Sequence, residues 1–199
     1  MTNLISLDSP VLVPARVLAK TLLGLANQIL HPTRRYRARR RLRALGAPGK
    51  ILMVCTGNVC RSPYAEVKAR ESGGDAPRWE VRSAGWMGPS GRSPPPEAVE
   101  VARARGLDLQ GHRSQLLSEE LVGWADLLLV MERSHAKICR DEFRADGRRI
   151  LLLGDLDPAL PRRREVPDPW GRPQGDFEAA FDRIDRCLNE LSLLTEPGW

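Results

Sequence analysis

The residues best suited to chemistry stand in one short stretch, Cys55-Thr56-Gly57-Asn58-Val59-Cys60-Arg61-Ser62. The apolar run before it, residues 51–54, predicts a buried strand, whereas Pro63 behind it is typical of the first turn of a helix. A loop at such a junction can turn its unpaired backbone amides, here those of residues 56–62, towards a tetrahedral anion, with the positive end of the helix dipole behind them. The stretch therefore predicts a phosphate-binding loop with a thiol at its base.

The spacing of Cys55 and Arg61 indicates what the loop would do with a phosphate. Five residues separate them, so a loop wrapped around one phosphate brings the sulfur to the phosphorus while the guanidinium grips two equatorial oxygens. Attack by the sulfur would form a phosphocysteine intermediate. The amides and Arg61 favour the thiolate, and Ser62 can donate a hydrogen bond to it.

The cysteines leave other possibilities open. Cys55 and Cys60 would also suit a buried structural thiol or half of a zinc knuckle, but zinc needs two more ligands at close spacing, and Cys139 and Cys187 stand far apart. The sequence therefore predicts no metal and no cofactor. A reversible disulfide between Cys55 and Cys60 would protect the nucleophile from over-oxidation; the alternative is that Cys60 only fills space under the loop.

From residue 50 onward, patterns that predict strands alternate with patterns that predict helices. The predicted strands are residues 51–54, 79–83, 127–131 and 150–153, and the predicted helices are residues 63–72, 97–105, 133–144 and 176–194. Such alternation is typical of a doubly wound α/β domain with a parallel sheet. Loops at strand ends build the site in that architecture, so the glycine- and proline-rich residues 84–96 are expected beside the phosphate loop.

Several further stretches resemble those of low-molecular-weight protein tyrosine phosphatases of the bacterial type. In chain order they are Ser62-Pro63-Tyr64-Ala65-Glu66, Ser83-Ala84-Gly85, Gly106-Leu107-Asp108 with His112, residues 125–132, and Asp168-Pro169-Trp170. The resemblance covers residues 50 to about 195. It implies a three-layer, doubly wound domain on a four-stranded parallel sheet and a protein-tyrosine-phosphatase that works through phosphocysteine.

The resemblance also implies roles for single residues. Cys55 would be the nucleophile, Arg61 would bind the phosphoryl group, and Asp168 would be the general acid and then the base, giving an acidic optimum. The expected substrate-binding residues are Thr56, Gly57, Asn58, Val59, Cys60, Ser62, Trp86 and Trp170. Trp86 would be a wall against the tyrosine ring, although a core position is the alternative. His112 would support Asn58 from beneath the loop, or else be an exposed loop histidine.

Two rival functions use the same fold or the same loop. Arsenate reductases also need two resolving cysteines close together in a mobile segment, whereas Cys139 and Cys187 are 48 residues apart. A non-catalytic phosphotyrosine-binding module would be favoured by loss of Cys55, Arg61 or Asp168. All three are present, so the phosphatase hypothesis is preferred.

The basic charge of the chain belongs to an N-terminal extension, predicted as residues 1–49, and not to the phosphatase domain, predicted as residues 50–199. Residues 1–50 contain ten Lys and Arg and a single acidic residue, whereas the remainder contains 21 bases and 24 acids. Pro14 and Pro32 bracket a predicted amphipathic helix. Its apolar residues recur at helical spacing, and they are Leu18, Leu22, Leu25 and Ile29.

Seven arginines occupy the ten positions 34–43, directly after that helix. An apolar helical face followed by arginines suits reversible attachment of residues 14–43 to an anionic membrane surface. The equal alternative is a helix that docks on the catalytic domain or on a partner, with the arginines as a solvated linker. Nucleic acid is disfavoured as a partner, because a single tyrosine offers little stacking and no known nucleic-acid-binding fold surrounds the arginines.

The compartment and the substrate follow from more general considerations. A catalytic thiolate needs reducing surroundings, and the first ten residues lack the basic start of a signal peptide, so the cytoplasm is expected. The substrate is expected to be a phosphotyrosine protein. Bacterial relatives of this kind often oppose tyrosine kinases that control polysaccharide export, and the basic extension would suit a membrane-linked kinase. No oligomeric state is predicted.

Overall fold

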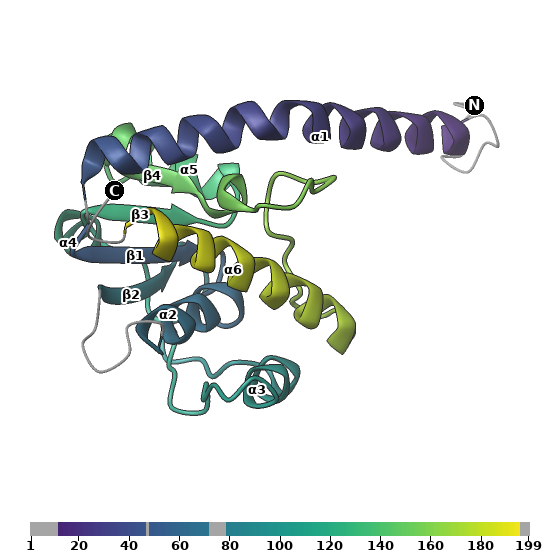
Figure 1. Cartoon of the computed structure of the whole chain (residues 1–199). Helices are drawn as coiled ribbons and strands as arrows, with labels where there is room; N and C mark the ends of the chain where they lie inside the picture. The colour runs from purple at the N-terminus through teal and green to yellow at the C-terminus, as the bar shows by residue number, and fades with distance from the viewer. Residues whose placement is uncertain (1–11, 47, 72–78, 196–199) are drawn as a thin grey trace, which may run out of the picture.

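The computed structural model describes residues 12–46, 48–71 and 79–195 (Figure 1). Its strands are β1 (Lys50–Cys55), β2 (Glu80–Gly85), β3 (Leu127–Val130) and β4 (Ile150–Leu152). Its helices are α1 (Leu12–Leu45), α2 (Arg61–Glu71), α3 (Pro96–Arg103), α4 (Glu119–Trp124), α5 (Arg133–Asp141) and α6 (Gln174–Leu194), with short 3-10 turns η1 (Gly147–Arg149) and η2 (Leu153–Leu156).

The four strands form one parallel sheet in the order β2-β1-β3-β4. The two central strands, β1 and β3, are buried almost throughout, which explains their unbroken apolar sequences. The strand order reverses between β1 and β3, and in such sheets ligands bind beyond the carboxyl ends of the strands at that point. Cys55 is the last residue of β1, so the fold places the thiol there.

Helices cover both faces of the sheet, as the alternating side chains of β1 require. Ile51 and Met53 face a core shared with α2, α3 and α6, whereas Leu52 and Val54 face a smaller core with α4 and α5. The predicted three-layer, doubly wound fold with four parallel strands is confirmed.

Some local predictions differ from the structure. Helix α2 begins at Arg61, two residues before the proline that was expected to open it, and its predicted glycine stop at residues 73–74 lies outside the described residues. Helix α4 was not predicted, because it is only six residues long. Its start is set by Ser118, whose side chain accepts a hydrogen bond from the amide of Leu121.

Helix α1 is longer than the sequence predicted. It runs through Pro32 and includes the arginine run, so both the stop at Pro32 and the solvated linker are wrong. A proline inside a helix costs about 3 kcal/mol, and tertiary contacts on both sides offset this. His31 is buried, with Nε2 2.7 Å from the carbonyl oxygen of Asp157, and Ala38 and Leu42 belong to the main core.

The apolar face predicted for α1 does not pack on the α/β domain. Leu18, Leu22, Leu25 and Ile29 are between 51% and 76% exposed. The N-terminal half of α1 extends beyond the sheet, while the C-terminal half lies over β4 and α6 (Figure 1). The helix docks instead through its opposite side, where Arg35 and Arg39 also form ion pairs with Glu190 of α6.

Docking of α1 makes a matched pair of substitutions informative. Leu42→Ala should lower the free energy of unfolding by about 2–5 kcal/mol, because Leu42 is 1% exposed and the truncation leaves a cavity. Leu18→Ala, in the same helix but 60% exposed, should change it by less than about 0.5 kcal/mol. Thermal unfolding followed by circular dichroism measures both. Equal effects of the two substitutions would mean that α1 is not part of the folded core.

Candidate active site

A cleft of about 310 Å³ lies at the carboxyl end of β1. Its lining comes from the loop after β1, the loop after β2 and the loop before α6, and consists of Cys55, Thr56, Gly57, Val59, Cys60, Arg61, Met87, Gly88, Arg92, Asp168 and Trp170. The structure thus brings the proposed nucleophile, phosphate-binding arginine and general acid together, although Asp168 is more than a hundred residues from Cys55 along the chain.

The thiol of Cys55 is surrounded by hydrogen-bond donors. Its sulfur accepts hydrogen bonds from the hydroxyl of Ser62 at 3.0 Å and from the backbone amide of Asn58 at 3.3 Å. Helix α2 begins at Arg61, and its N-terminus carries a partial positive charge. Donors and dipole both stabilise a negatively charged sulfur.

Asn58 holds the loop in its curled shape. Its backbone φ is +53°, a left-handed conformation that asparagine tolerates better than most residues. Its side-chain amide donates to the hydroxyls of Ser62 and Ser83, at 3.0 and 2.7 Å, and accepts from the amide of Gln115 at 2.8 Å. Nε2 of His112 lies 2.8 Å from the carbonyl oxygen of Asn58, as the resemblance implied. The loop is thereby tied to β2 and to the segment after α3.

Gly85, the last residue of β2, lets the loop come this close to the sheet. A Cβ at this position would lie 2.7 Å from the backbone nitrogen of Asn58 and 2.8 Å from the carbonyl oxygen of Thr56, both backbone atoms. Any larger residue would push the loop away. This steric limit is the physical reason for a glycine at the end of the Ser83-Ala84-Gly85 stretch.

Arg61 is the central charge of the site and is only 1% exposed. One terminal nitrogen donates to Glu132 at 2.6 Å and to the carbonyl oxygen of Val166 at 3.0 Å. The other donates to Asp168 at 2.5 Å and to the hydroxyl of Thr56 at 3.2 Å. Burial by itself lowers the pKa of Arg61, but the negative groups around it outweigh burial and raise the pKa, so the guanidinium stays charged.

His135 lies behind this network and was not predicted as a site residue. It is 1% exposed, and its Nε2 is 3.1 Å from the hydroxyl of Thr56, which in turn contacts Arg61. Nδ1 has no hydrogen-bond partner in the described part of the chain. Burial, helped by the charge of Arg61, lowers the pKa of His135 to about 4, so the imidazole is neutral at neutral pH.

The mouth of the cleft has an apolar side formed by Met87 and Trp170, which are about half exposed. Trp86 does not line the cleft; its neighbour Met87 takes the place expected for it. Arg92 crosses the mouth, where it donates to the carbonyl oxygen of Gly57 at 2.9 Å and lies 6.0 Å from the ring centre of Trp170. An aromatic ring entering the cleft would meet Met87 and Trp170.

Sequence reasoning missed Glu132, His135 and Arg92 as site residues. Glu132 and His135 had a usable signal, because they directly follow the buried strand β3 at the edge where the strand order reverses. Arg92 had none, because arginines are frequent throughout this chain and nothing in the sequence of its loop sets this one apart. In the described part of the chain, no three His, Cys, Asp or Glu side chains gather so as to hold a metal ion.

A family model of low molecular weight phosphotyrosine protein phosphatases matches residues 50–196. The chain belongs to this family. Among known proteins, the low molecular weight protein-tyrosine-phosphatase Wzb of Salmonella typhi is 36% identical over 151 residues, which cover 75% of this chain and 97% of Wzb. The predicted family and protein-tyrosine-phosphatase activity are thus confirmed.

Solved structures of the family resemble this phosphatase closely. The low molecular weight protein tyrosine phosphatase from T. tengcongensis has a TM-score of 0.66 at 31% identity and covers 72% of this chain and 97% of its own. The YwlE arginine phosphatase from Geobacillus stearothermophilus has a TM-score of 0.66 at 29% identity, with 73% and 92% covered. Since one of these neighbours is called an arginine phosphatase, phosphoarginine is a useful comparison substrate.

The neutral, buried imidazole of His135 predicts a pH dependence of stability. Its pKa is about 4 in the folded protein against a usual value of 6.5. As the pH falls below 6.5, His135 binds a proton in the unfolded chain but not in the folded protein. The free energy of unfolding of the wild type therefore decreases until about pH 4. Relative to His135→Asn, this loss should reach up to about 3 kcal/mol. Urea unfolding at several pH values measures it, and parallel curves for the two proteins would contradict the prediction.

Proposed function

We propose that this phosphatase hydrolyses phosphotyrosine in proteins with Cys55 as nucleophile, Arg61 as phosphate-binding residue and Asp168 as general acid and base. The observation that carries the proposal is the convergence of these three side chains on one cleft. In the first step the sulfur of Cys55 attacks phosphorus, the bond from phosphorus to the tyrosine oxygen breaks, and Asp168 gives its proton to that oxygen.

In the second step a water molecule attacks the phosphorus of phosphocysteine. Asp168, now a carboxylate, takes a proton from this water, the sulfur–phosphorus bond breaks, and inorganic phosphate leaves with the thiolate restored. Charge on the equatorial oxygens is stabilised by Arg61 and by the loop amides of residues 56–62 in both steps.

The contact between Arg61 and Asp168 supports an order of events in which phosphate binding comes before proton transfer by Asp168. The substrate phosphate would compete with Asp168 for the guanidinium, and its arrival would release the carboxyl group to face the leaving oxygen. Among the supporting residues, Asn58, Ser62 and His112 keep the loop and the thiolate in place. Trp170 forms a wall for the tyrosine ring, and Trp86 is left as a second aromatic group of the neighbouring loop.

The rival functions find less support. An arsenate reductase needs accessible resolving thiols, whereas Cys139 and Cys187 are fully buried and burial raises the pKa of both, that of Cys139 to about 11. A non-catalytic phosphotyrosine-binding module would have no need of a general acid in contact with Arg61. Hydrolysis with phosphocysteine as intermediate remains the function that the cleft favours.

The catalytic roles can be tested with aryl phosphates. Hydrolysis of phosphotyrosine and para-nitrophenyl phosphate from about pH 4 to 8 should be abolished in Cys55→Ser and should lose its acidic optimum in Asp168→Asn. A chelator should not change the rate, since Arg61 and the amides supply the positive charge. Phosphoarginine is the comparison substrate, and faster hydrolysis of phosphoarginine than of phosphotyrosine would overturn the proposed specificity.

We further propose that residues 1–49 form an accessory extension that brings the catalytic domain, residues 50–199, to an anionic membrane surface in the cytoplasm. The substrate would then be a membrane-linked tyrosine kinase or another phosphotyrosine protein of a polysaccharide-export system. None of the helices in the described ranges has the length and apolar composition that crossing a bilayer requires. Attachment would therefore involve a surface of α1.

The outward face of α1 supports this location. We define it as Leu18, Leu22, Leu25, Ile29, Tyr36, Arg40 and Arg43, which recur at spacings of three, four and seven and are all exposed. Such spacings place them on one side of the helix. The residues that face the domain recur at spacings of seven and four on the opposite side of the helix, and they are Gly24, His31, Ala38 and Leu42. One continuous helix of 34 residues, about 50 Å long, thus has a domain side and a free side.

The free side is apolar along its first half and basic along its second. Arg40 and Arg43 of this face have no side-chain partner in the described part of the chain, and neither has Arg37 beside them. Apolar side chains that enter the lipid interface and arginines worth about 1 kcal/mol each near acidic headgroups would together give reversible binding. Acidic lipid satisfies both halves of the face, whereas a second copy of α1 would bring arginines together.

Vesicle sedimentation tests the membrane proposal. The whole protein should bind vesicles that contain phosphatidylglycerol and not vesicles of phosphatidylcholine alone, and high salt should weaken binding. Leu22→Glu and Ile29→Glu should abolish binding, while the matched control Leu193→Glu, an exposed leucine of α6, should not. Binding that survives both outward-face substitutions would contradict the proposal, as would a dimer in solution that these substitutions disrupt.

A further inference from the structure

A second hollow adjoins the catalytic cleft on the far side of Asp168. It is a groove of about 710 Å³ between the segment 161–169 and residues 176–186 of α6, and we refer to it as the α6 groove. Asp168 lines both the groove and the cleft. A polypeptide with a phosphotyrosine in the cleft therefore has neighbouring residues within reach of the groove, since each extended residue spans about 3.3 Å.

The α6 groove is rich in arginine, and three of its arginines have no partner among the residues that the structure describes. Arg162, Arg163 and Arg172 are exposed, and within the described ranges their guanidinium groups make no hydrogen bond or ion pair. The other two, Arg183 and Arg186, are held by the buried carboxylate of Asp157. The first three are thus available to a ligand, whereas the other two already share a carboxylate.

The acids of the α6 groove cancel little of this charge. Glu132 and Asp168 are paired with Arg61, and Glu165 is paired with Arg133. Asp176, at the start of α6, is the lining acid for which no such pair is found among the described residues. Among the described residues, three arginines without a partner thus stand against one acid without a partner, which leaves the groove electropositive.

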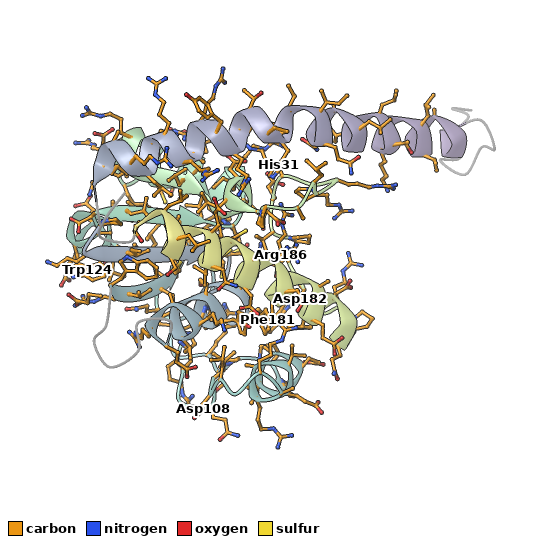
Figure 2. All side chains as sticks on the ribbon, in the orientation of Figure 1. His31, Asp108, Trp124, Phe181, Asp182 and Arg186 are labelled. Atoms are coloured by element: carbon orange, nitrogen blue, oxygen red, sulfur yellow. The ribbon has the colours of Figure 1, made fainter. Side chains whose placement is uncertain are left out.

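Helix α1 holds the segment that forms the outer wall of the groove. Asn27 donates to the carbonyl oxygen of Arg162 at 3.2 Å, and Gln28 donates to that of Leu160 at 3.0 Å. One turn later His31 meets the carbonyl oxygen of Asp157, and Figure 2 shows His31 on the domain side of α1, above Arg186. The family model begins at residue 50, after α1. This support of the groove is therefore an addition to the domain that the family shares.

We propose that the α6 groove binds an acidic stretch of the substrate polypeptide that flanks the phosphotyrosine. This rests on the proposed function of the cleft, because the same polypeptide occupies both. The arginines act on binding and not on chemistry, so they affect protein and peptide substrates but not small aryl phosphates. Acidic lipid is a poor occupant, because the groove lies on the domain side of α1 and not on its outward face.

Phosphotyrosine peptides with different flanking residues test the proposal. At low salt, kcat/KM should be about tenfold higher for a peptide flanked by Asp and Glu than for one flanked by Ser and Gln, if each of the three ion pairs contributes about 0.5 kcal/mol. High salt should remove the difference. Lysine in the same positions should lower kcat/KM below that of the neutral peptide.

Substitutions then locate the preference. Arg162→Ala/Arg163→Ala should lose most of the tenfold preference, and Arg172→Ala part of it, with unchanged hydrolysis of para-nitrophenyl phosphate. Arg103→Ala, an exposed arginine at the end of α3, is the matched control and should keep the preference. Asn27→Ala/Gln28→Ala should also weaken it, because the outer wall loses both hydrogen bonds from α1.

Two outcomes would overturn the proposal. One is a wild-type protein without preference for acidic flanks; the other is a preference that survives Arg162→Ala/Arg163→Ala. Binding of the same peptides to Cys55→Ser gives a reading that does not depend on turnover. If the wild-type protein does not hydrolyse aryl phosphates, the proposed catalytic roles are wrong. If Cys55→Ser binds acidic and neutral peptides equally well, the proposed role of the groove is wrong.

Discussion

The site depends on one buried positive charge, that of Arg61. A guanidinium that is 1% exposed must be paired, since an uncompensated charge in the interior is strongly destabilising. The chain meets this requirement from three directions: Thr56 from the phosphate loop, Glu132 from the end of β3, and Val166 with Asp168 from the loop before α6. The same contacts that neutralise Arg61 therefore assemble the active site. The negative phosphate of a substrate can enter because one of these partners, Asp168, lies on the cleft side and is partly exposed.

How much of this the sequence could predict depends on the range of the interactions. The phosphate loop is a local feature, because Cys55, Gly57 and Pro63 constrain a strand, a turn and a helix start within nine residues, and the parallel sheet follows from apolar runs in β1 and β3. Roles that need distant contacts were less accessible. The place of His135 after β3 is a signal that it lies near the site, but its contact with Thr56 depends on how α5 packs against the loop.

Helix α1 illustrates the other limit of local reasoning. Pro32 is a strong local signal for a helix end, and it was wrong because the contacts of His31, Ala38 and Leu42 with the domain hold the helix on both sides of the proline. The apolar pattern of Leu18 to Ile29 was read correctly as one face. The sequence could not tell whether that face would be covered, because covering is decided by the surface it meets.

The segment between η2 and α6 connects α1 with the active site. Its beginning, residues 157–162, is held by α1, its middle by Asp155, Arg183 and Met131, and its end carries Asp168 and Trp170 into the cleft. Since residues 164–166 are anchored on the catalytic domain itself, loss of α1 contacts would leave Asp168 close to Arg61. It would instead free the stretch that forms the wall of the α6 groove. Two sets of contacts thus hold the two ends of this segment: those of the family domain keep Asp168 at Arg61, whereas those of α1 hold the residues that lead into the wall of the α6 groove.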